Sequence, residues 1–389
     1  MMKMMTCMPS ARCCLRFVPG LLLFFLSSPF AADDVLDPKL AKNDPDEQTR
    51  WYDIAYLNVE GQGWTKTESF YDRLPAKAKG VVRDPVWKLG QNSAGMCVRF
   101  LSDATGIKAR WTLRSEKLAL PHMPATGVSG LDLYVKTDNG RWRWLAVGQP
   151  TKFPVNSVQL AKDLPGGKRE YLLYLPLYNG VESVELGIPK DTTIAKAGPW
   201  GPGARKPMVF YGTSITQGGC ASRPGMVHTA ILGRQLHYPV INLGFSGNGK
   251  MEPEMANLLA ELDPALYLLD CLPNMTAAEV TERVEPFVRT IRKAHPKTPV
   301  VLVEDRSYTD SFLVQIKRQR NLESRAALRA AYERLVAADF EDLHYVPGEQ
   351  LLGDDGEATV DSSHPTDLGF MRQATAFQAV LEGILRAEK

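Results

Sequence analysis

Four separated segments carry residue types that together could perform acyl transfer. Ser214 offers a hydroxyl group, which is a weak nucleophile until a neighbouring base takes its proton. His364 could be that base, and Asp361, three residues earlier, could fix the histidine tautomer from within one tight turn. The backbone N–H groups of Ser214 and Gly247 and the side-chain amide of Asn274 could bind an oxyanion. The residues therefore predict a serine esterase site with a Ser-His-Asp triad.

The elements that must position these residues alternate between strand and helix. Short apolar strands are predicted at 208–211, 240–243, 265–269, 299–303 and 343–346. Helices are predicted at 227–236, 255–262, 276–294, 323–338 and 367–387. This alternation predicts an α/β fold with a doubly wound parallel sheet. Because sites in such sheets lie at the carboxyl ends of the strands, we expect the four segments to meet at one edge.

The first half of the chain has the pattern of an all-β domain. Residues 108–114 alternate between apolar and polar side chains, which is the period of a half-buried strand. Residues 131–136 and 142–147 flank Asp138-Asn139-Gly140, a strong signal for a hairpin turn. Further strands are predicted at 171–178 and 181–188. Many short strands with turns between them indicate a sandwich of jelly-roll type.

The N-terminus resembles a secretory signal. Lys3, Arg12 and Arg16 precede an apolar run over residues 17–26, which is too short to span a bilayer comfortably, and small residues follow. A retained membrane anchor is the alternative. Without this segment the chain has 43 basic and 44 acidic residues, so nothing suggests a nucleic-acid partner. No later stretch is long and apolar enough to cross a membrane, and we expect a periplasmic or secreted protein.

Composition changes sharply near residue 200. All seven tryptophans lie at or before Trp200, and glycine and proline are concentrated in residues 198–207. We therefore divide the chain into a signal peptide at 1–32, a β-sandwich at 33–198, a linker at 199–206 and an α/β domain at 207–389.

The four segments resemble the blocks of the SGNH hydrolase (GDSL esterase) family over about residues 206–389. That family supplies its serine, glycine, asparagine and Asp-x-x-His pair in the order found here, at Ser214, Gly247, Asn274 and Asp361 with His364. The first block reads Gly-Thr-Ser where the family name expects Gly-Asp-Ser, and the third reads Pro-Asn-Met where Gly-x-Asn-Asp is common. Neither change removes a catalytic atom.

The sandwich carries a second resemblance. Its segment Gly130-Leu-Asp-Leu-Tyr134 is similar to the Gly-x-Asp-Leu-Tyr motif of a domain that precedes certain bacterial SGNH hydrolases. The two resemblances imply a flavodoxin-like hydrolase domain behind an all-β domain. They also imply an exported esterase that removes small acyl groups, acetyl foremost, from a carbohydrate.

Two other functions stay open at this point. An esterase for lipids or lysophospholipids would need an apolar groove, and an inactive glycan-binding protein would bind without turnover. No cofactor or metal is expected, because the triad performs acyl chemistry unaided. The acyl group, the alcohol and the oligomeric state do not follow from the sequence.

Several other polar residues have a structural interpretation. Cys97, Cys220 and Cys271 could include one disulfide or remain three buried thiols. The remaining histidines are predicted to be structural or on the surface, although His228 could line the pocket: His122, His228, His237, His295 and His344. An acidic cluster is predicted to be a solvated loop and not a metal site: Glu304, Asp305 and Asp310. Trp142 and Trp144 are predicted to lie in the sandwich core, with stacking on sugar rings as the alternative.

Overall fold

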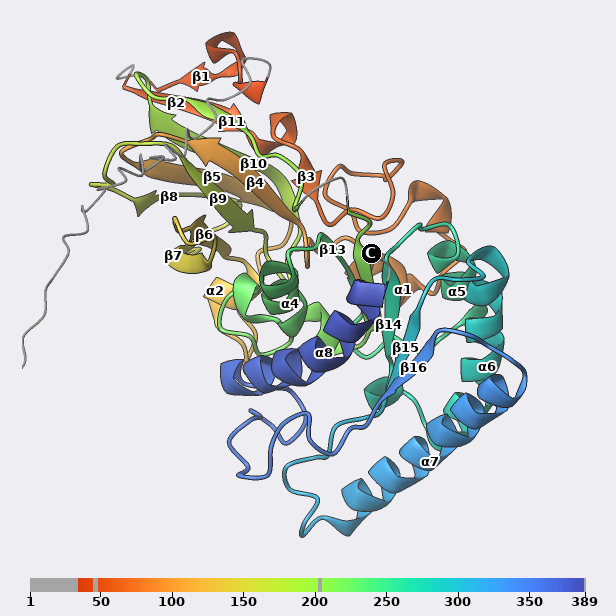
Figure 1. The fold of residues 1–389 in the computed structure, drawn as a ribbon. Coiled ribbons are helices and arrows are strands. Elements are labelled where there is room, and N and C mark those ends of the chain that lie inside the picture. Colours follow the sequence, from red (N-terminus) through yellow and green to blue (C-terminus); the bar gives the residue numbers. More distant parts are fainter. Residues whose placement is uncertain (1–33, 45–47, 202–204, 388–389) are drawn as a thin grey trace, which may run out of the picture.

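The computed structural model describes residues 34–44, 48–201 and 205–387, so the predicted signal peptide lies outside the described residues. Two antiparallel sheets form the first part of the chain (Figure 1), in the orders β1-β2-β10-β5-β8 and β11-β4-β9-β6-β7, with β3 paired to β4. Their strands are β1 (Lys42–Asn43), β2 (Thr49–Asp53), β3 (Val59–Glu60), β4 (Cys97–Ser102), β5 (Ile107–Leu113), β6 (Leu131–Lys136), β7 (Trp142–Gly148), β8 (Val155–Ala161), β9 (Arg169–Tyr174), β10 (Val181–Pro189) and β11 (Ile194–Lys196).

The core of this sandwich lies between the two sheets. Along β5 every second residue is buried, which is the alternation expected from the sequence. Trp111 is fully buried there and donates from Nε1 to the carbonyl oxygen of Ser129 at 3.1 Å. The hairpin of β6 and β7 turns at Gly140, whose φ of 78° suits glycine. The predicted all-β domain is confirmed.

The second part of the chain is a five-stranded parallel sheet in the order β13-β12-β14-β15-β16. Its strands are β12 (Met208–Gly212), β13 (Val240–Gly244), β14 (Leu266–Asp270), β15 (Val300–Val303) and β16 (Leu343–Val346). The chain turns from one side of β12 to the other between β13 and β14, so β12 and β14 border the switch point of a doubly wound sheet. The predicted α/β fold class is confirmed.

Helices cover both faces of this sheet (Figure 1). One face carries α3 (Ser214–Gln217), α4 (His228–Leu236) and α8 (Asp367–Ala387). The other carries α5 (Pro253–Leu259), α6 (Ala277–Ala294) and α7 (Gln315–Ala337). The predicted capping box of Thr276 and Glu279 opens α6. Helix α7 begins eight residues before the predicted start at 323, because its first turns are mostly polar and their Ile316 points to solvent.

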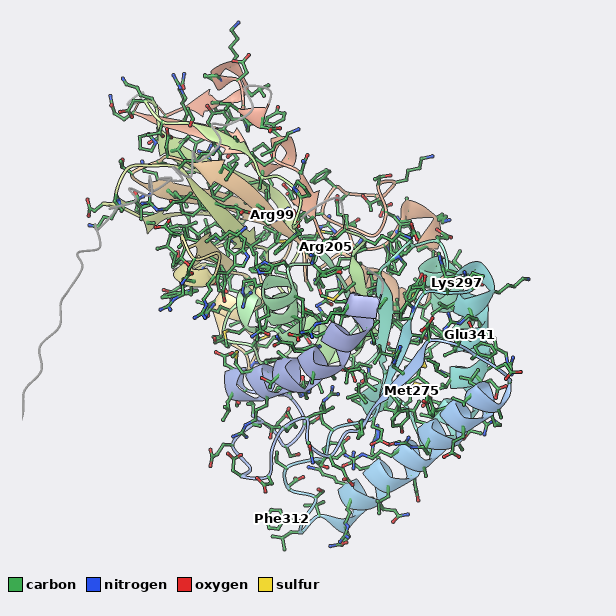
Figure 2. The ribbon with its side chains drawn as sticks, in the orientation of Figure 1. Arg99, Arg205, Met275, Lys297, Phe312 and Glu341 are labelled. Atoms are coloured by element: carbon green, nitrogen blue, oxygen red, sulfur yellow. The ribbon has the colours of Figure 1, made fainter. Side chains whose placement is uncertain are left out.

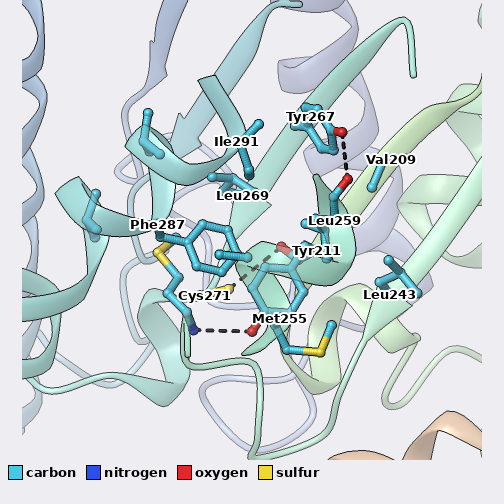
Figure 3. Close-up of a cluster of buried hydrophobic side chains, with 14 of the residues drawn as sticks. Val209, Tyr211, Leu243, Met255, Leu259, Tyr267, Leu269, Cys271, Phe287 and Ile291 are labelled. Atoms are coloured by element: carbon cyan, nitrogen blue, oxygen red, sulfur yellow. Dashed lines mark hydrogen bonds between the residues drawn. The ribbon is translucent and has the colours of Figure 1, made fainter. Parts of the chain in front are cut away.

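Aromatic and aliphatic side chains fill the space beneath α5 and α6 (Figure 3). Tyr211 of β12 stacks on Phe287 of α6, with ring centroids 5.3 Å apart. Residues before the predicted linker also enter this core, since Leu74, Val86 and Trp87 pack with the parallel sheet, the last two from α1 (Asp84–Gly90). Among the described residues, every helix is too short or too polar to cross a bilayer.

Arginines hold the two ends of the segment that joins the two parts. Arg99 of β4 pairs with Glu60 and Glu170 and donates to the carbonyl oxygen of Gly198, while Arg205 donates to the end of α4 (Figure 2). The prediction that Trp142 and Trp144 belong to the sandwich core is wrong. They lie outside it, on the face toward the second domain, where Arg223 packs over the Trp144 ring. Alternation alone predicts that two side chains share a face, but not which face is covered.

Candidate active site

The structure places Ser214 at the switch point of the parallel sheet. It is the first residue of α3, directly after β12, and Thr213 caps that helix by accepting from the Ile215 N–H. The turn is tight, since a side chain at Gly212 would meet the Thr216 hydroxyl. Ser214 is only 7% exposed, so its neighbours cover most of the residue.

His364 and Asp361 meet Ser214 at this edge. The Oγ of Ser214 lies 2.8 Å from Nε2 of His364, and the Nδ1 of His364 lies 2.8 Å from Oδ2 of Asp361. An imidazole that donates from Nδ1 to a carboxylate has Nε2 free to accept the serine proton. This is the geometry that a serine nucleophile, a general base and an orienting carboxylate require.

The loop that carries the Asp-His pair is fixed from both sides. Its ends are joined by hydrogen bonds from Val360 N–H to the His364 oxygen and from Thr366 N–H to the Ala358 oxygen. Ser362 adopts a φ of 72° and accepts hydrogen bonds from the Thr309 N–H in the loop before α7 and from Lys317 in the first turn of α7. The histidine therefore sits on a rigid turn at the start of α8.

Hydrogen bonding keeps Asp361 ionised. Partial burial alone would raise its pKa, but the backbone and ring N–H groups of His364 and the Ser363 N–H hold that pKa below its usual value. A carboxylate at this position stabilises the imidazolium that forms when the histidine takes a proton.

The oxyanion candidates come from the loops after β13 and β14. Gly247 has a φ of 69°, which suits glycine, and it is exposed with open space around its Cα. Asn274 ends a short 3-10 helix over Leu272–Asn274. Its amide is satisfied when the oxygen accepts from the N–H groups of Asn248 at 3.0 Å and Gly249 at 3.2 Å. In that orientation the NH₂ group points away from these two N–H groups, on the side where an acceptor can bind it.

Residues of the sandwich domain bond directly to Ser214 and to its helix. Tyr178 donates to the carbonyl oxygen of Ser214 at 3.1 Å. Gln217, which is fully buried, donates to the Leu177 oxygen and to Asn92, and its own oxygen accepts from the Ser246 N–H. The α3 helix and the Gly247 loop are therefore held by residues from both domains.

His122 lies at the site, although the sequence predicted a surface or structural role. It is exposed on a turn of the sandwich domain, and its ring centroid lies 5.7 Å from that of His364. Sequence separation hid this residue, because nothing in its local pattern links it to a loop 242 residues later. His228, in contrast, is buried among Phe210, Phe370 and Phe377, as a structural role requires.

Two further predictions can be judged. Cys97, Cys220 and Cys271 are buried free thiols, so the disulfide alternative is wrong. The acidic cluster is also not a solvated loop, since Glu304 and Asp305 are buried and Glu304 accepts from the Tyr345 hydroxyl and the Gly348 N–H. Burial of these carboxylates depends on the folded neighbours α7 and β16, which the local sequence does not reveal.

Two family models match the chain, one in each half. The GDSL-like lipase/acylhydrolase family matches residues 205–382. A model described as the N-terminus of SGNH-hydrolase-type esterases, GxDLY, matches residues 49–194. None of the curated proteins compared with the chain matches it.

Solved structures give the same result. A GDSL-like lipase from Bacteroides ovatus ATCC 8483 is 35% identical, with a TM-score of 0.82 over 87% of this chain and 98% of that one. The salicylyl-acyltransferase SsfX3 from a tetracycline biosynthetic pathway is 18% identical, with a TM-score of 0.65 over 88% and 96%. The acetyl xylan esterase Est2A from the rumen bacterium Butyrivibrio proteoclasticus is 12% identical, with a TM-score of 0.53 over 87% and 99%. The last two show the fold alone. The chain belongs to the GDSL-like lipase/acylhydrolase (SGNH esterase) family with a GxDLY N-terminal domain, and it is a carboxylic ester hydrolase.

Proposed function

We propose that this protein is an exported esterase that removes small acyl groups, foremost acetyl, from a carbohydrate, with Ser214, His364 and Asp361 as its triad. The observation that carries the triad assignment is the unbroken hydrogen-bonded path from Ser214 Oγ through both nitrogens of His364 to Asp361. Each link is 2.8 Å long, within the range for proton transfer.

The reaction follows from this path. Ser214 Oγ attacks the ester carbonyl carbon while its proton moves to Nε2 of His364. The oxyanion accepts from the N–H groups of Ser214 and Gly247 and from the Asn274 amide. When the C–O bond breaks, the leaving alkoxide takes the proton from His364. Water then attacks the acyl-serine carbonyl while its proton moves to His364. When the bond to Ser214 Oγ breaks, Oγ takes that proton back from His364, and the carboxylic acid leaves.

The exposure of the site supports a large polar alcohol. The side chains of Asp361 and His364 are 42% and 25% exposed, and His122 beside them is exposed as well. An ester group on a long glycan could therefore reach Ser214 while the rest of the chain stays outside. Solved structures with this fold include esterases described as acting on carbohydrate, among them the acetyl xylan esterase.

The location is proposed from the N-terminus. The basic residues and the apolar run at 17–26 have the pattern of a secretory signal, and a periplasmic or extracellular enzyme would meet glycans there.

The test compares acyl length and alcohol. We expect turnover of p-nitrophenyl acetate to exceed turnover of the butyrate and octanoate esters, and acetate to be released from acetylated xylan. Ser214→Ala should abolish both activities, whereas Ser183→Ala, a matched serine on the sandwich, should leave them unchanged. Binding of acetylated xylan without any Ser214-dependent turnover would instead identify an inactive glycan-binding protein.

A lipid ester is the second candidate, and one feature favours it. Phe312, Leu313 and Ile316 are 73–80% exposed on the segment that begins α7, which bonds the triad loop at Ser362 (Figure 2 labels Phe312). If octanoate is preferred and Phe312→Ser lowers that preference selectively, the lipid function replaces the carbohydrate function.

A further inference from the structure

Three side chains with metal-binding atoms gather beside the triad. His122, Cys220 and His364 each offer one ligand atom, and these atoms all lie within 4.8 Å of one another. They come from a turn of the sandwich domain, from the loop after α3 and from the triad loop. Two imidazoles and a thiol are the ligand types that Zn²⁺ prefers.

Two of the three residues, His122 and Cys220, are held near each other by the packing of their segments. His122 lies in a tight turn closed by two hydrogen bonds between Leu120 and Met123. Met123 is buried in the same cluster as Ala221, the neighbour of Cys220. The turn and the cysteine loop are thus packed against each other, which leaves little freedom to separate the first two ligands.

Cys220 has an unusual backbone. Its φ of 72° lies in the left-handed region, which disfavours a residue with a side chain by roughly 1 kcal/mol or more. Glycine would relieve this strain, and glycines occupy the two preceding positions, 218 and 219. A cysteine side chain at this position therefore strains the backbone where glycine would not.

The separations between the three ligand atoms are slightly longer than those in a tetrahedral Zn²⁺ site. Zn–N bonds of about 2.0 Å and Zn–S bonds of about 2.3 Å place tetrahedral ligand atoms about 3.3–3.8 Å apart. Atoms within 4.8 Å of one another need to close by about 1.5 Å at most, and the exposed His122 ring can supply that movement by rotating about its side-chain bonds. A water molecule would complete the tetrahedron.

We propose that His122, Cys220 and His364 form an inhibitory Zn²⁺ site that joins the two domains across the active site. Inhibition follows whichever nitrogen of His364 binds the metal. A metal on Nε2 blocks proton transfer from Ser214, and a metal on Nδ1 breaks the bond to Asp361. The Cys220 thiol releases its proton to solvent as the Zn–S bond forms, so charge and atoms balance.

The triad hydrogen bonds join Ser214, His364 and Asp361 and do not involve Cys220, so the thiol can be replaced with those bonds intact. The inhibition rests on the proposed role of His364, whereas metal binding itself does not.

Binding is tested without any substrate. Co²⁺ added to the wild-type protein should give one bound ion with a thiolate-to-metal charge-transfer absorption band, and excess Zn²⁺ should remove that band. Cys220→Ser and His122→Asn should lose the band, whereas Cys271→Ser, a matched buried thiol, should keep it. A band that persists in Cys220→Ser, or none in the wild type, overturns the site.

Inhibition is tested with an ester that wild-type protein hydrolyses. Zn²⁺ should inhibit hydrolysis reversibly, with recovery on adding EDTA, and Mg²⁺ and Ca²⁺ should not inhibit because they prefer oxygen ligands. Measured against each variant's own metal-free kcat/KM, His122→Asn and Cys220→Ser should raise the inhibitory Zn²⁺ concentration by about 10–100-fold. Equal Zn²⁺ sensitivity in both variants overturns the proposal. Metal binding that leaves turnover unaffected would instead count against His364 as the base.

Discussion

At the scale of single residues, the site depends on which atoms of His364 and Asn274 are already bonded. His364 donates to Asp361 from one ring nitrogen and is left with the other as a proton acceptor for Ser214. Asn274 uses its oxygen to accept from two backbone N–H groups and is left with an NH₂ donor. In both residues, the hydrogen bond to the protein determines which atom is left to act on the substrate: Nε2 of His364 as a base and the NH₂ group of Asn274 as a donor.

Asn274→Ala tests this selection at the oxyanion. The variant removes one donor, and we expect kcat to fall by about 10²–10³ with little change in KM, as loss of one oxyanion donor typically does. Steady-state kinetics would be measured beside the melting temperature, because the N–H groups of Asn248 and Gly249 also lose their acceptor. An unchanged kcat would remove Asn274 from the site.

Gly219→Ala tests how closely the backbone packs against the base. A Cβ there would lie 2.9 Å from the Tyr178 hydroxyl and 3.2 Å from Cδ2 of His364. The Tyr178 hydroxyl must shift and the histidine ring must give by a few tenths of an ångström, whereas a displacement of about 1 Å can lower the rate about 100-fold. We expect kcat to fall by up to about 10-fold while the fold survives. Gly166→Ala, where a Cβ meets open space, is the control, and equal kinetics in the two variants would contradict the argument.

At the residue level, the sequence allows placement to be predicted where a motif and a strand end coincide. Ser214, Gly247, Asn274 and Asp361 each follow a short apolar strand or precede a long helix, so their placement at one edge follows from the sheet rule. His122 could not be found in this way, because it reaches the site through contact between domains. Contacts of that kind depend on tertiary packing and leave no periodic signal.

At the scale of elements, strands were more predictable than the loops that carry charge. The strands of the parallel sheet are buried on both sides and therefore read as apolar runs. The loop after β15 was misinterpreted, because Asp305 and Arg306 look solvated in sequence but are 3% and 2% exposed. Arg306 pairs with the buried Asp270 at 2.7 Å, which makes a charged loop part of the core.

Asp305 gives this loop a measurable pH dependence. Burial raises its pKa to about 6, although Arg306, Arg320 and Arg325 oppose the shift. Because the folded pKa exceeds the ordinary value near 3.9, the folded protein binds more protons between about pH 4 and pH 6. The unfolding free energy therefore falls as pH rises through this window, and the loss is complete above it.

Asp305→Asn should remove that loss. Relative to the wild type, we expect its unfolding free energy to improve between about pH 4 and pH 7 by at most about 3 kcal/mol. Urea unfolding at several pH values would measure the difference. Asp191→Asn changes an exposed carboxylate and is the control. If the two variants track each other across the range, the burial of Asp305 does not govern the stability of this loop.

At the scale of the whole molecule, residues of the first domain contact the segments that carry the proposed active site. Arg73 is 1% exposed and donates to the carbonyl oxygens of Asn242 and Gly244 at the end of β13, where the Gly247 loop begins. Burial lowers its pKa to about 9, so it remains charged at neutral pH. Together with Tyr178 and Gln217, it ties the nucleophile and the oxyanion loop to the first domain.

The Gly-Leu-Asp-Leu-Tyr motif has a physical role in this union. Leu131 and Leu133 point into the sandwich core, whereas Asp132 and Tyr134 contact the second domain. Asp132 is fully buried, and its Oδ2 accepts from Arg223 and from the Gly225 N–H, each at 2.8 Å. Its Oδ1 accepts from the Trp144 indole at 3.0 Å. Successive side chains of the motif therefore pack alternately in the sandwich core and against the second domain.

Asp132→Asn should weaken the coupling between the domains. The amide can accept from only one side, so Arg223 or its neighbours lose a partner, and breaking one member of a buried pair typically costs about 3–5 kcal/mol. We expect calorimetry to show a lower melting temperature, with the sandwich and the catalytic domain unfolding in separate transitions where the wild type shows one. Asp263→Asn, which breaks the exposed pair with Lys206, should shift stability by less than about 1 kcal/mol. A single, unshifted transition in Asp132→Asn would mean that the motif serves only the sandwich, and that Arg73, Tyr178 and Gln217 hold the two domains together without it.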